Sequence, residues 1–283
     1  MAEVESAPGH TATLAAVGRA FHLESDNPLV KDHLALGLAG EAGTTLQAEL
    51  TKQLPEASRL AFGLAFAIRA RFVEDAVDSA VRDGVRQYVI LGAGLDSFAY
   101  RRPDLNEGLK IFEVDRAGAQ AWKRRRLAEL DVSIPASVAF VPIDHETDDL
   151  RAALTDAGFD ASAPAIVSAM ALTQYLAPPA IEKILNLVGT FASGSRLILT
   201  YVVPATELSD LAAAGLAWTM SQAEARGERF LSLFRPDEID DLIQRNGFLR
   251  VDHFGPRELI DLYLADQPDA QLTGIERLAT ASV

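Results

Sequence analysis

The chain lacks cysteine altogether in its 283 residues. Without thiols there is no disulfide framework, no zinc–thiolate site and no cysteine nucleophile. Long apolar runs are missing too, since none reaches the roughly 20 residues that a membrane-spanning helix requires. Residues 1–5 form no apolar leader. These absences predict a cytoplasmic protein without a membrane partner.

Positive charge is also in short supply. Lysine and arginine number 26 against 40 aspartate and glutamate residues, which gives a net charge of −14. Such a surface repels phosphate backbones, so we expect no nucleic-acid partner. The five histidines lack the spacing of metal ligands, which predicts no metal site. Composition leaves the oligomeric state, monomer or homodimer, open.

Hydrophobic periodicity divides the chain near residue 82. Before this point apolar residues recur at helical spacing, and after it short β-rich runs alternate with helical runs. The predicted strands are 87–91, 110–114, 138–143, 165–170, 196–203 and 249–254, and 275–283 is expected to return as an edge strand. Such alternation predicts an α/β fold with a mainly parallel sheet and helices on both faces. We therefore expect a helical cap over residues 1–82 and a core over residues 83–283, with a substrate-side insert near 204–235.

A glycine turn follows the first predicted strand. Gly92-Ala93-Gly94 comes directly after four apolar residues. Glycines let a backbone approach a ligand closely, and ligands bind beyond the carboxyl ends of parallel strands. The turn therefore predicts a site for a nucleotide-like cofactor. A dinucleotide fingerprint would need a third glycine where this chain has Ser97, which disfavours an NAD(P)-dependent oxidoreductase but keeps it as an alternative. A turn that serves only tight packing is the other alternative.

Carboxylates follow the next two predicted strands. Glu113 and Asp115 end the second strand, where a carboxylate can accept hydrogen bonds from ribose hydroxyls. Asp115 equally suits an N-cap of the following helix. Asp144 lies just past the third strand, from which it could accept a hydrogen bond from an adenine amino group. Thr147 is the expected N-cap of the next helix.

The residues around the glycine turn resemble a known signature. Residues 91–101 read LGAGLDSFAYR and are similar to the LGAGLDTRAYR signature of the leucine carboxyl methyltransferase-like superfamily, including its actinobacterial and polyketide O-methyltransferase branch. Further segments resemble family motifs in the same order: 11–20, 27–32, 69–75, 112–115, Asp144 and 247–248. The resemblance thus covers nearly the whole chain.

This resemblance implies a Rossmann-like class I methyltransferase with a seven-stranded sheet, a lid of N-terminal helices and S-adenosylmethionine as cofactor. It implies that one arginine of the pair Arg69 and Arg71 binds the methionine carboxylate, and Arg69 is favoured. It further implies that Gly92 and Gly94 flank the methionine, that Asp115 binds the ribose, and that Asp144 and His145 border the adenine. Ala93, Asp96 and Glu113 are the remaining candidate cofactor-binding residues.

One segment departs from the family pattern. The family commonly has E-G-V-x-x-Y-L after its fourth strand, and this chain has Met170 and Ala171 in place of the glutamate and the glycine. Tyr175 and Leu176 fit the pattern. Met170 is thus expected in the wall of the cofactor site. Its presence opens the alternative of an S-adenosylmethionine-binding protein that does not transfer the methyl group.

The leading interpretation is an O-methyltransferase for a small-molecule acceptor, with a carboxyl group favoured over a phenol and a role in secondary metabolism. A carboxylate acceptor needs no base, whereas a phenol would profit from one. The sequence assigns no catalytic residue, and the candidate bases are His145, His253, Tyr175 and Tyr201. The expected acceptor-binding residues, each of which also suits core packing, are Tyr175, Trp218, Met220 and Phe230.

Overall fold

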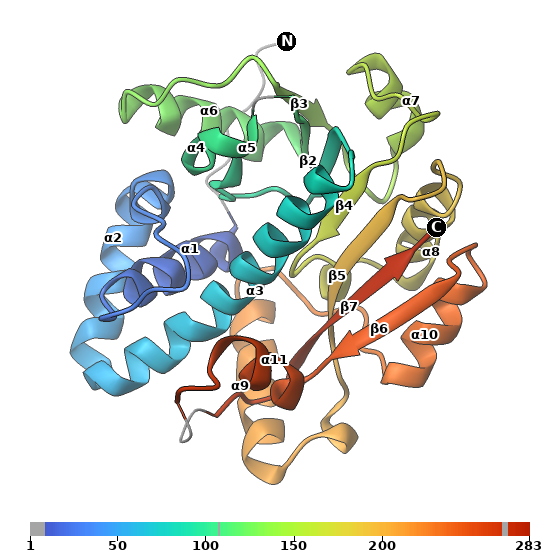
Figure 1. Cartoon of the computed structure of the whole chain (residues 1–283). Helices are drawn as coiled ribbons and strands as arrows, with labels where there is room; N and C mark the ends of the chain where they lie inside the picture. The colour runs from blue at the N-terminus through green and yellow to red at the C-terminus, as the bar shows by residue number, and fades with distance from the viewer. Residues whose placement is uncertain (1–8, 107, 268–270) are drawn as a thin grey trace.

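A seven-stranded sheet forms the centre of the molecule in the computed structural model, which describes residues 9–106, 108–267 and 271–283 (Figure 1). The strand order is β3-β2-β1-β4-β5-β7-β6, and all strands are parallel except β7, which is antiparallel to both of its neighbours. The strands are β1 (Gln87–Leu91), β2 (Lys110–Asp115), β3 (Val138–Pro142), β4 (Ile166–Ala169), β5 (Arg196–Val202), β6 (Arg250–Phe254) and β7 (Glu276–Ser282).

Helices occupy the connections between these strands. The α-helices are α1 (His10–Leu23), α2 (Ala35–Gln53), α3 (Glu56–Arg82), α4 (Phe98–Arg101), α5 (Pro103–Asn106), α6 (Ala117–Glu129), α7 (Leu150–Asp156), α8 (Pro178–Val188), α9 (Asp210–Glu224), α10 (Pro236–Gln244) and α11 (Pro256–Tyr263). Two short 3₁₀ turns, η1 (Thr173–Tyr175) and η2 (Ala205–Glu207), follow β4 and β5. Of these described helices, none is both long enough and apolar enough to span a membrane.

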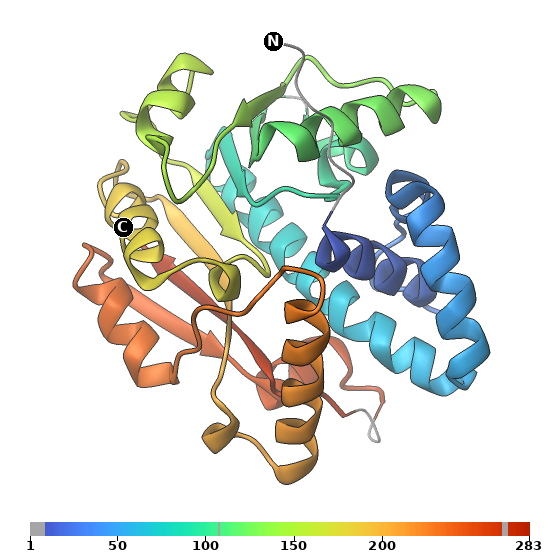
Figure 2. The same ribbon diagram turned by 180° about the vertical axis from the view of Figure 1, so that it is seen from behind.

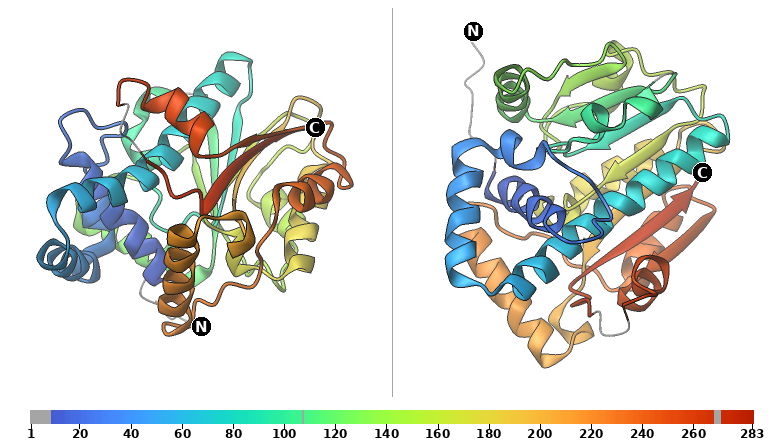
Figure 3. Two further views of the ribbon diagram at one scale, coloured as in Figure 1. Left: turned by 90° about the horizontal axis from the view of Figure 1, so that it is seen from below. Right: turned by 60° about the vertical axis from the view of Figure 1, so that its left-hand side comes forward.

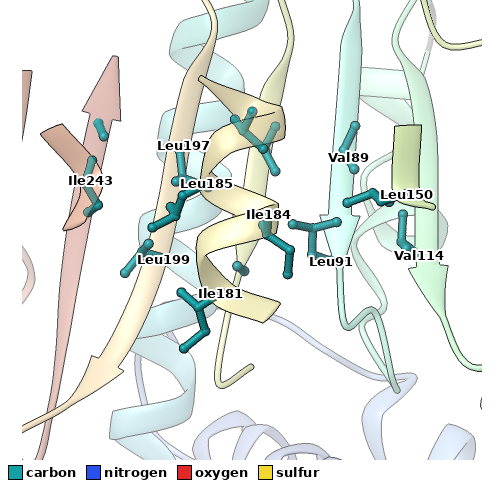
Figure 4. Packing of buried hydrophobic residues seen from close by; sticks show 14 of the residues in the cluster. Val89, Leu91, Val114, Leu150, Ile181, Ile184, Leu185, Leu197, Leu199 and Ile243 are labelled. Atoms are coloured by element: carbon teal, nitrogen blue, oxygen red, sulfur yellow. The ribbon is translucent and has the colours of Figure 1, made fainter. Parts of the chain in front are cut away.

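One face of the sheet is covered by α7, α8 and α10 (Figure 2). Helix α8 turns Ile181, Ile184 and Leu185 toward the strands, where they pack with residues such as Leu91 and Leu199 (Figure 4). All five residues of β1 are buried, as expected of a central parallel strand that is covered on both sides.

The opposite face is covered by α3, α4 and α11, and α1 packs against both α2 and α3 (Figure 3). Helix α2 also contacts α6. Its helical geometry is interrupted at Gly40, whose φ of 64° makes a kink. The three N-terminal helices thus form one cluster beside the sheet.

The α/β class and the mainly parallel, seven-stranded sheet agree with the sequence-based prediction. The placement of the last strand was wrong. Strand β7 lies between β5 and β6 rather than at the edge, because it pairs with seven residues of β5 and five of β6. The N-cap of α7 was also wrong, since Asp149 rather than Thr147 accepts the hydrogen bond from Ala152 N.

Candidate functional site

The turn after β1 brings backbone to the edge of the sheet. Gly92 has a φ of 66° and Gly94 a φ of 43°, a region that glycine adopts without strain. A Cβ atom at Gly92 would lie 3.0 Å from Leu172 Cδ1, so this position also has little room for a side chain. The turn is fixed by the Gly94 N–H, which donates to Asp115 Oδ2 at 2.6 Å.

A cavity of about 680 Å³ opens at this turn. Its size lies within the range of small-molecule and cofactor sites, roughly 300–1,000 Å³. It is bounded by the carboxyl ends of the parallel strands, by α1 and α3, and by the segment after α9. The predicted cofactor residues that line it are Arg69, Gly92, Ala93, Gly94, Asp96, Asp115, Asp144, His145 and Met170. The structure thus brings together nine of the residues that the sequence had selected.

The two arginines of α3 have different surroundings. Arg69 lines the cavity, where its guanidinium lies 4.6 Å from the centre of the Phe66 ring and Nη1 lies 2.6 Å from Glu276 Oε2. The side chain of Arg71 is 42% exposed and pairs with Asp75 one helical turn away. Residues two positions apart point to different sides of a helix. Arg69, the arginine favoured from the sequence, is therefore the one available to a ligand.

Glu113 does not line the cavity, contrary to its predicted role at the ribose. It is fully buried, and its Oε2 lies 2.7 Å from Lys123 Nζ of α6. A buried carboxylate requires a partner of this kind. Glu113 therefore belongs to the core between β2 and α6, and Asp115 alone turns toward the cavity.

The acidic residues past β2 and β3 lie on either side of Arg116. Asp115 Oδ1 accepts the Arg116 N–H at 2.7 Å, and Asp144 Oδ2 lies 3.6 Å from Arg116 Nε. His145 follows in the same wall, and burial lowers its pKa. Because its usual pKa is near 6.5, the ring is neutral at pH 7. This end of the cavity therefore offers carboxylate acceptors and a neutral imidazole to a polar, uncharged ligand group.

A buried ionic network lies behind the glycine turn. Asp32 accepts from Arg19 Nε at 2.7 Å and from Ser97 Oγ at 2.6 Å. Arg101 donates to the same Ser97 Oγ at 2.9 Å and pairs with Glu74 at 2.5 Å. Burial alone would raise the pKa of Asp32, but Arg19, Arg101 and Ser97 hold it below its usual value. The separate segments that resembled one family thus meet in a single cluster.

Tyr175 marks one end of the cavity, whereas Phe230, predicted to bind the acceptor, is not among the residues that line it. Tyr175 lines it, and the Phe230 ring meets the Tyr175 ring edge-on at 5.2 Å. Trp218 and Met220, predicted to bind the acceptor, do not line the cavity, and Trp218 is 67% exposed on α9. No residue of α9 lines the cavity, and this part of the wall is formed by the segment after the helix.

Two of the four candidate bases lie outside the cavity. Tyr201 Oη and His253 Nδ1 form a 3.0 Å hydrogen bond between β5 and β6, and neither residue lines the cavity. Burial raises the pKa of Tyr201 to about 12. This pair connects two strands of the sheet, and the candidate bases within the cavity are Tyr175 and His145.

Three residues of the site were missed in the sequence analysis. Thr11 lines the cavity at the start of α1, and both its N–H and its hydroxyl donate to Glu228, which follows α9. Glu276 reaches Arg69 from β7. Thr11 and Glu228 are 217 positions apart, and Arg69 and Glu276 are 207 apart. No local pattern could have paired them, because only the fold brings them together.

A seven-stranded sheet with a glycine turn after β1 and acids beyond β2 and β3 defines the class of Rossmann-like, S-adenosylmethionine-dependent methyltransferases. Within that class, the chain belongs to the leucine carboxyl methyltransferase family, whose profile matches residues 12–189. The nicotinamide alternative is therefore set aside.

Relatives from bacteria agree with this assignment. The chain is 27% identical over 281 residues to the Bacillus subtilis (strain 168) protein named "Putative S-adenosyl-L-methionine-dependent methyltransferase YktD", with 92% of each chain covered. It is 36% identical over 223 residues to a Mycolicibacterium gilvum (strain PYR-GCK) protein named "Putative S-adenosyl-L-methionine-dependent methyltransferase". This match covers 74% of this chain and 71% of that one.

Solved structures share the fold at low sequence identity. A DUF574 family protein from Streptomyces avermitilis MA-4680 superposes with a TM-score of 0.60 at 15% identity, covering 97% of each chain. A protein from Thermobifida fusca YX, described as a "putative methyltransferase", gives 0.56 at 19% identity, covering 97% of this chain and 94% of that one. These similarities support the α/β Rossmann-like architecture.

The residues present fit an S-adenosylmethionine group. The position of Gly92 has little room for a side chain, so backbone itself faces the cavity. An arginine lines one part of the wall and carboxylates line another, as a ligand with an anionic group and several hydrogen-bond donors would require.

Proposed function

We propose that this protein is an S-adenosylmethionine-dependent O-methyltransferase that esterifies the carboxylate of a small molecule. The observation that carries the proposal is the wall beyond β4, which is formed by Met170, Ala171, Leu172 and Tyr175. Three of these side chains are apolar, and burial raises the pKa of Tyr175, so it remains a neutral phenol. A wall without a base suits an acceptor that is already anionic at neutral pH.

His145 is poorly placed to be that base. It follows β3, whereas Met170 follows β4, and β2 and β1 lie between these strands. Three strand spacings amount to about 14 Å. A general base must lie within hydrogen-bond reach of the proton that it removes. His145 therefore fits the wall around a cofactor better than the acceptor.

The cofactor roles follow from the arrangement of the wall. Arg69 would bind the methionine carboxylate, since a guanidinium matches a carboxylate with paired N–H donors. The glycine turn would lie against the methionine chain, Asp115 would accept from the ribose hydroxyls, and Asp144 with His145 would border the adenine. The roles from the glycine turn onward follow the order of the strands β1, β2 and β3 in the sheet.

The bound cofactor would supply a methyl group on a sulfonium, which passes to the acceptor oxygen as a C–O bond forms and the C–S bond breaks. The protein's part is to align the two reactants and to exclude water. Tyr175 is suited to orient the acceptor because its neutral hydroxyl can donate a hydrogen bond. Thr11 and Glu228 close the cavity above it. A role in secondary metabolism stays a prediction from the family resemblance.

The test is transfer of label from methyl-labelled S-adenosylmethionine to matched sets of small carboxylic acids and phenols. We expect base-labile label, as in methyl esters, at a rate that is nearly independent of pH between about 6 and 9, because carboxylates are ionised throughout this range. Transfer that occurs only to phenols and rises with pH would contradict the proposal. Tight cofactor binding without transfer to any acceptor would contradict it as well.

Two variants of α3 provide the matched comparison. Arg69→Met should weaken S-adenosylhomocysteine binding by roughly ten- to a hundredfold, as expected for loss of a hydrogen-bonded charge pair. Arg71→Met removes an arginine of the same helix that lies outside the cavity and should leave the affinity unchanged. Calorimetric titration measures both affinities, and equal losses in the two variants would refute the role of Arg69.

A further inference from the structure

The ion pair between Arg69 and Glu276 has one unused oxygen. Glu276 Oε2 lies 2.6 Å from Arg69 Nη1, and the two side chains are 16% and 22% exposed. Glu276 Oε1 is buried and makes no hydrogen bond within the described part of the chain. A buried carboxylate oxygen without a donor destabilises the folded protein, because its lost hydration is not replaced. Such an oxygen indicates a position where a ligand could donate.

The other carboxylates around the cavity are already engaged. Glu74 pairs with both Arg101 and Arg102, and Asp115 accepts backbone N–H groups with both oxygens. Asp96, Asp144 and Glu228 each accept at least one backbone N–H. Among the described residues, Glu74 Oε1 likewise makes no hydrogen bond, but it lies 2.5 Å from Arg101 Nη2 in an ion pair. Glu276 differs from Glu74 because its close contact with Arg69 is made through Oε2, the other oxygen.

The fold places Glu276 next to the cavity-lining Arg69, although Glu276 itself does not line the cavity. Glu276 is the first residue of β7, which is antiparallel, so it lies at the same edge of the sheet as the carboxyl ends of β4 and β5. Glu276 and Leu278 share one face of the strand, and Leu278 packs in the cluster that includes Phe72 and Val73 of α3. The negative charge of Glu276 helps raise the pKa of Tyr175, a lining residue, after burial and Glu228.

We propose that Arg69 and Glu276 together recognise the amino-acid end of the methyl donor, with Arg69 binding the α-carboxylate and Glu276 Oε1 accepting from the α-ammonium. This inference rests on the proposed function, because it takes the ligand of Arg69 to be the donor. A guanidinium and a carboxylate held side by side match the two opposite charges of an α-amino acid. Met170 cannot supply a charge there, so the strand β7 provides it.

The test compares three ligands by calorimetric titration of the 283-residue protein. S-adenosylhomocysteine carries both charges, an analogue without the α-amino group keeps only the carboxylate, and 5′-methylthioadenosine has neither. Glu276→Gln should weaken S-adenosylhomocysteine binding by roughly ten- to a hundredfold. The same variant should leave the other two ligands within about twofold of wild type, since neither donates to Glu276.

Asp75→Asn is the matched control, because Asp75 is the partner of Arg71 on the outer side of α3. It should change none of the three affinities. If Glu276→Gln weakens S-adenosylhomocysteine and the deaminated analogue equally, Glu276 only holds Arg69 in place and the inference is wrong. Unchanged S-adenosylhomocysteine affinity would overturn it too.

A failure of the proposed function looks different, since it would appear in the label-transfer assay of the wild-type protein or as a wild-type protein that does not bind S-adenosylhomocysteine. Thermal melting establishes whether each variant is folded. Should Glu276→Gln not fold, Glu276→Asp keeps the charge but shortens the side chain by one methylene. It should lose affinity for S-adenosylhomocysteine alone, and an equal loss for the deaminated analogue would again overturn the inference.

Discussion

At the scale of single residues, Ala171 holds an unusual backbone conformation. Its φ is 50°, and it is one of only two non-glycine residues with positive φ among the described residues. Its N–H donates to Thr200 Oγ1 at 2.7 Å, which holds the chain in this conformation. A left-handed conformation costs an L-residue about 1–2 kcal/mol. The family pattern described above commonly has glycine at this position, where this conformation is free of strain, and here an alanine adopts it.

Replacing Ala171 with glycine should therefore stabilise the protein. Part of the relieved strain is offset by the greater freedom of glycine in the unfolded chain, which leaves a gain of up to about 1 kcal/mol. For a chain of this length, that corresponds to a rise in Tm of about 2 °C. Thermal melting measures it.

Ala169→Gly, two residues earlier in β4, is the matched control. Ala169 is buried in a regular strand, where glycine should lower the stability by roughly 0.5–1 kcal/mol. If both variants lower Tm to the same extent, Ala171 is not strained.

Residue-level reasoning from the sequence succeeded where chemistry and chain position coincide. Asp115 and Asp144 end neighbouring strands, so their place beside the cavity followed from the fold alone. The ribose-binding role predicted for Glu113 was wrong, because the sequence does not show that Lys123 of α6 lies on the same side of β2. Glu276 was missed because its importance depends on a partner on another element. Pairing across the fold is the information that one sequence does not contain.

At the scale of elements, α1 and the segment after α9 are joined across the cavity. Glu228 Oε2 accepts the Thr11 N–H at 2.9 Å and also the Thr11 hydroxyl, and Thr11 Oγ1 lies 3.1 Å from Tyr175 Oη. The first N–H groups of a helix have no partner within it, and a carboxylate there also favours the helix dipole. The same segment is held further along by Leu231 N, which donates to Gln174 O at 2.7 Å. Glu228 therefore holds the start of α1 next to the cavity.

We expect Glu228→Ala to speed the release of bound S-adenosylhomocysteine. Loss of a cap and a dipole interaction costs about 1–2 kcal/mol, so the dissociation rate should rise by roughly tenfold. A stopped-flow chase with excess unlabelled ligand measures the rate. Glu224→Ala is the control, because Glu224 is exposed at the end of α9 and lies 3.9 Å from Arg229. A dissociation rate equal to that of the control would show that this contact does not hold the site closed.

Elements with a clear hydrophobic pattern in the sequence were predicted well. Elements whose position depends on packing or pairing with distant segments were not. Strand β1 was predicted at its observed bounds because a short apolar run leads directly into glycine. Helices α9 and α11 were not predicted. Helix α9 is rich in alanine and lacks a continuous apolar stripe. The position of β7 within the sheet depends on pairing with β5 and β6 and has no local signal.

At the scale of the whole molecule, a lower pH should destabilise the fold because it protonates a buried histidine. His22 is 5% exposed, and its Nε2 accepts the Leu29 N–H at 2.8 Å. Burial lowers the pKa of His22 below its usual value of 6.5. Between that value and the folded-state pKa, the unfolded chain binds more protons than the folded one. The stabilisation is therefore complete above pH 6.5 and is lost as the pH falls from 6.5 through the folded-state pKa.

A series of thermal or urea unfolding experiments from pH 7.5 to 5.5 should show this loss, with a slope of up to about 1.4 kcal/mol per pH unit from this one group. His22→Gln keeps an acceptor for Leu29 but cannot titrate, so its stability should fall less steeply with pH than that of the wild type. His33→Gln removes an exposed histidine and should keep the wild-type slope. The lowered pKa of Asp32 lies below its usual 3.8, so that carboxylate does not contribute in this range. If His22→Gln and the wild type lose stability in parallel, protonation of His22 is not what limits the fold in mild acid.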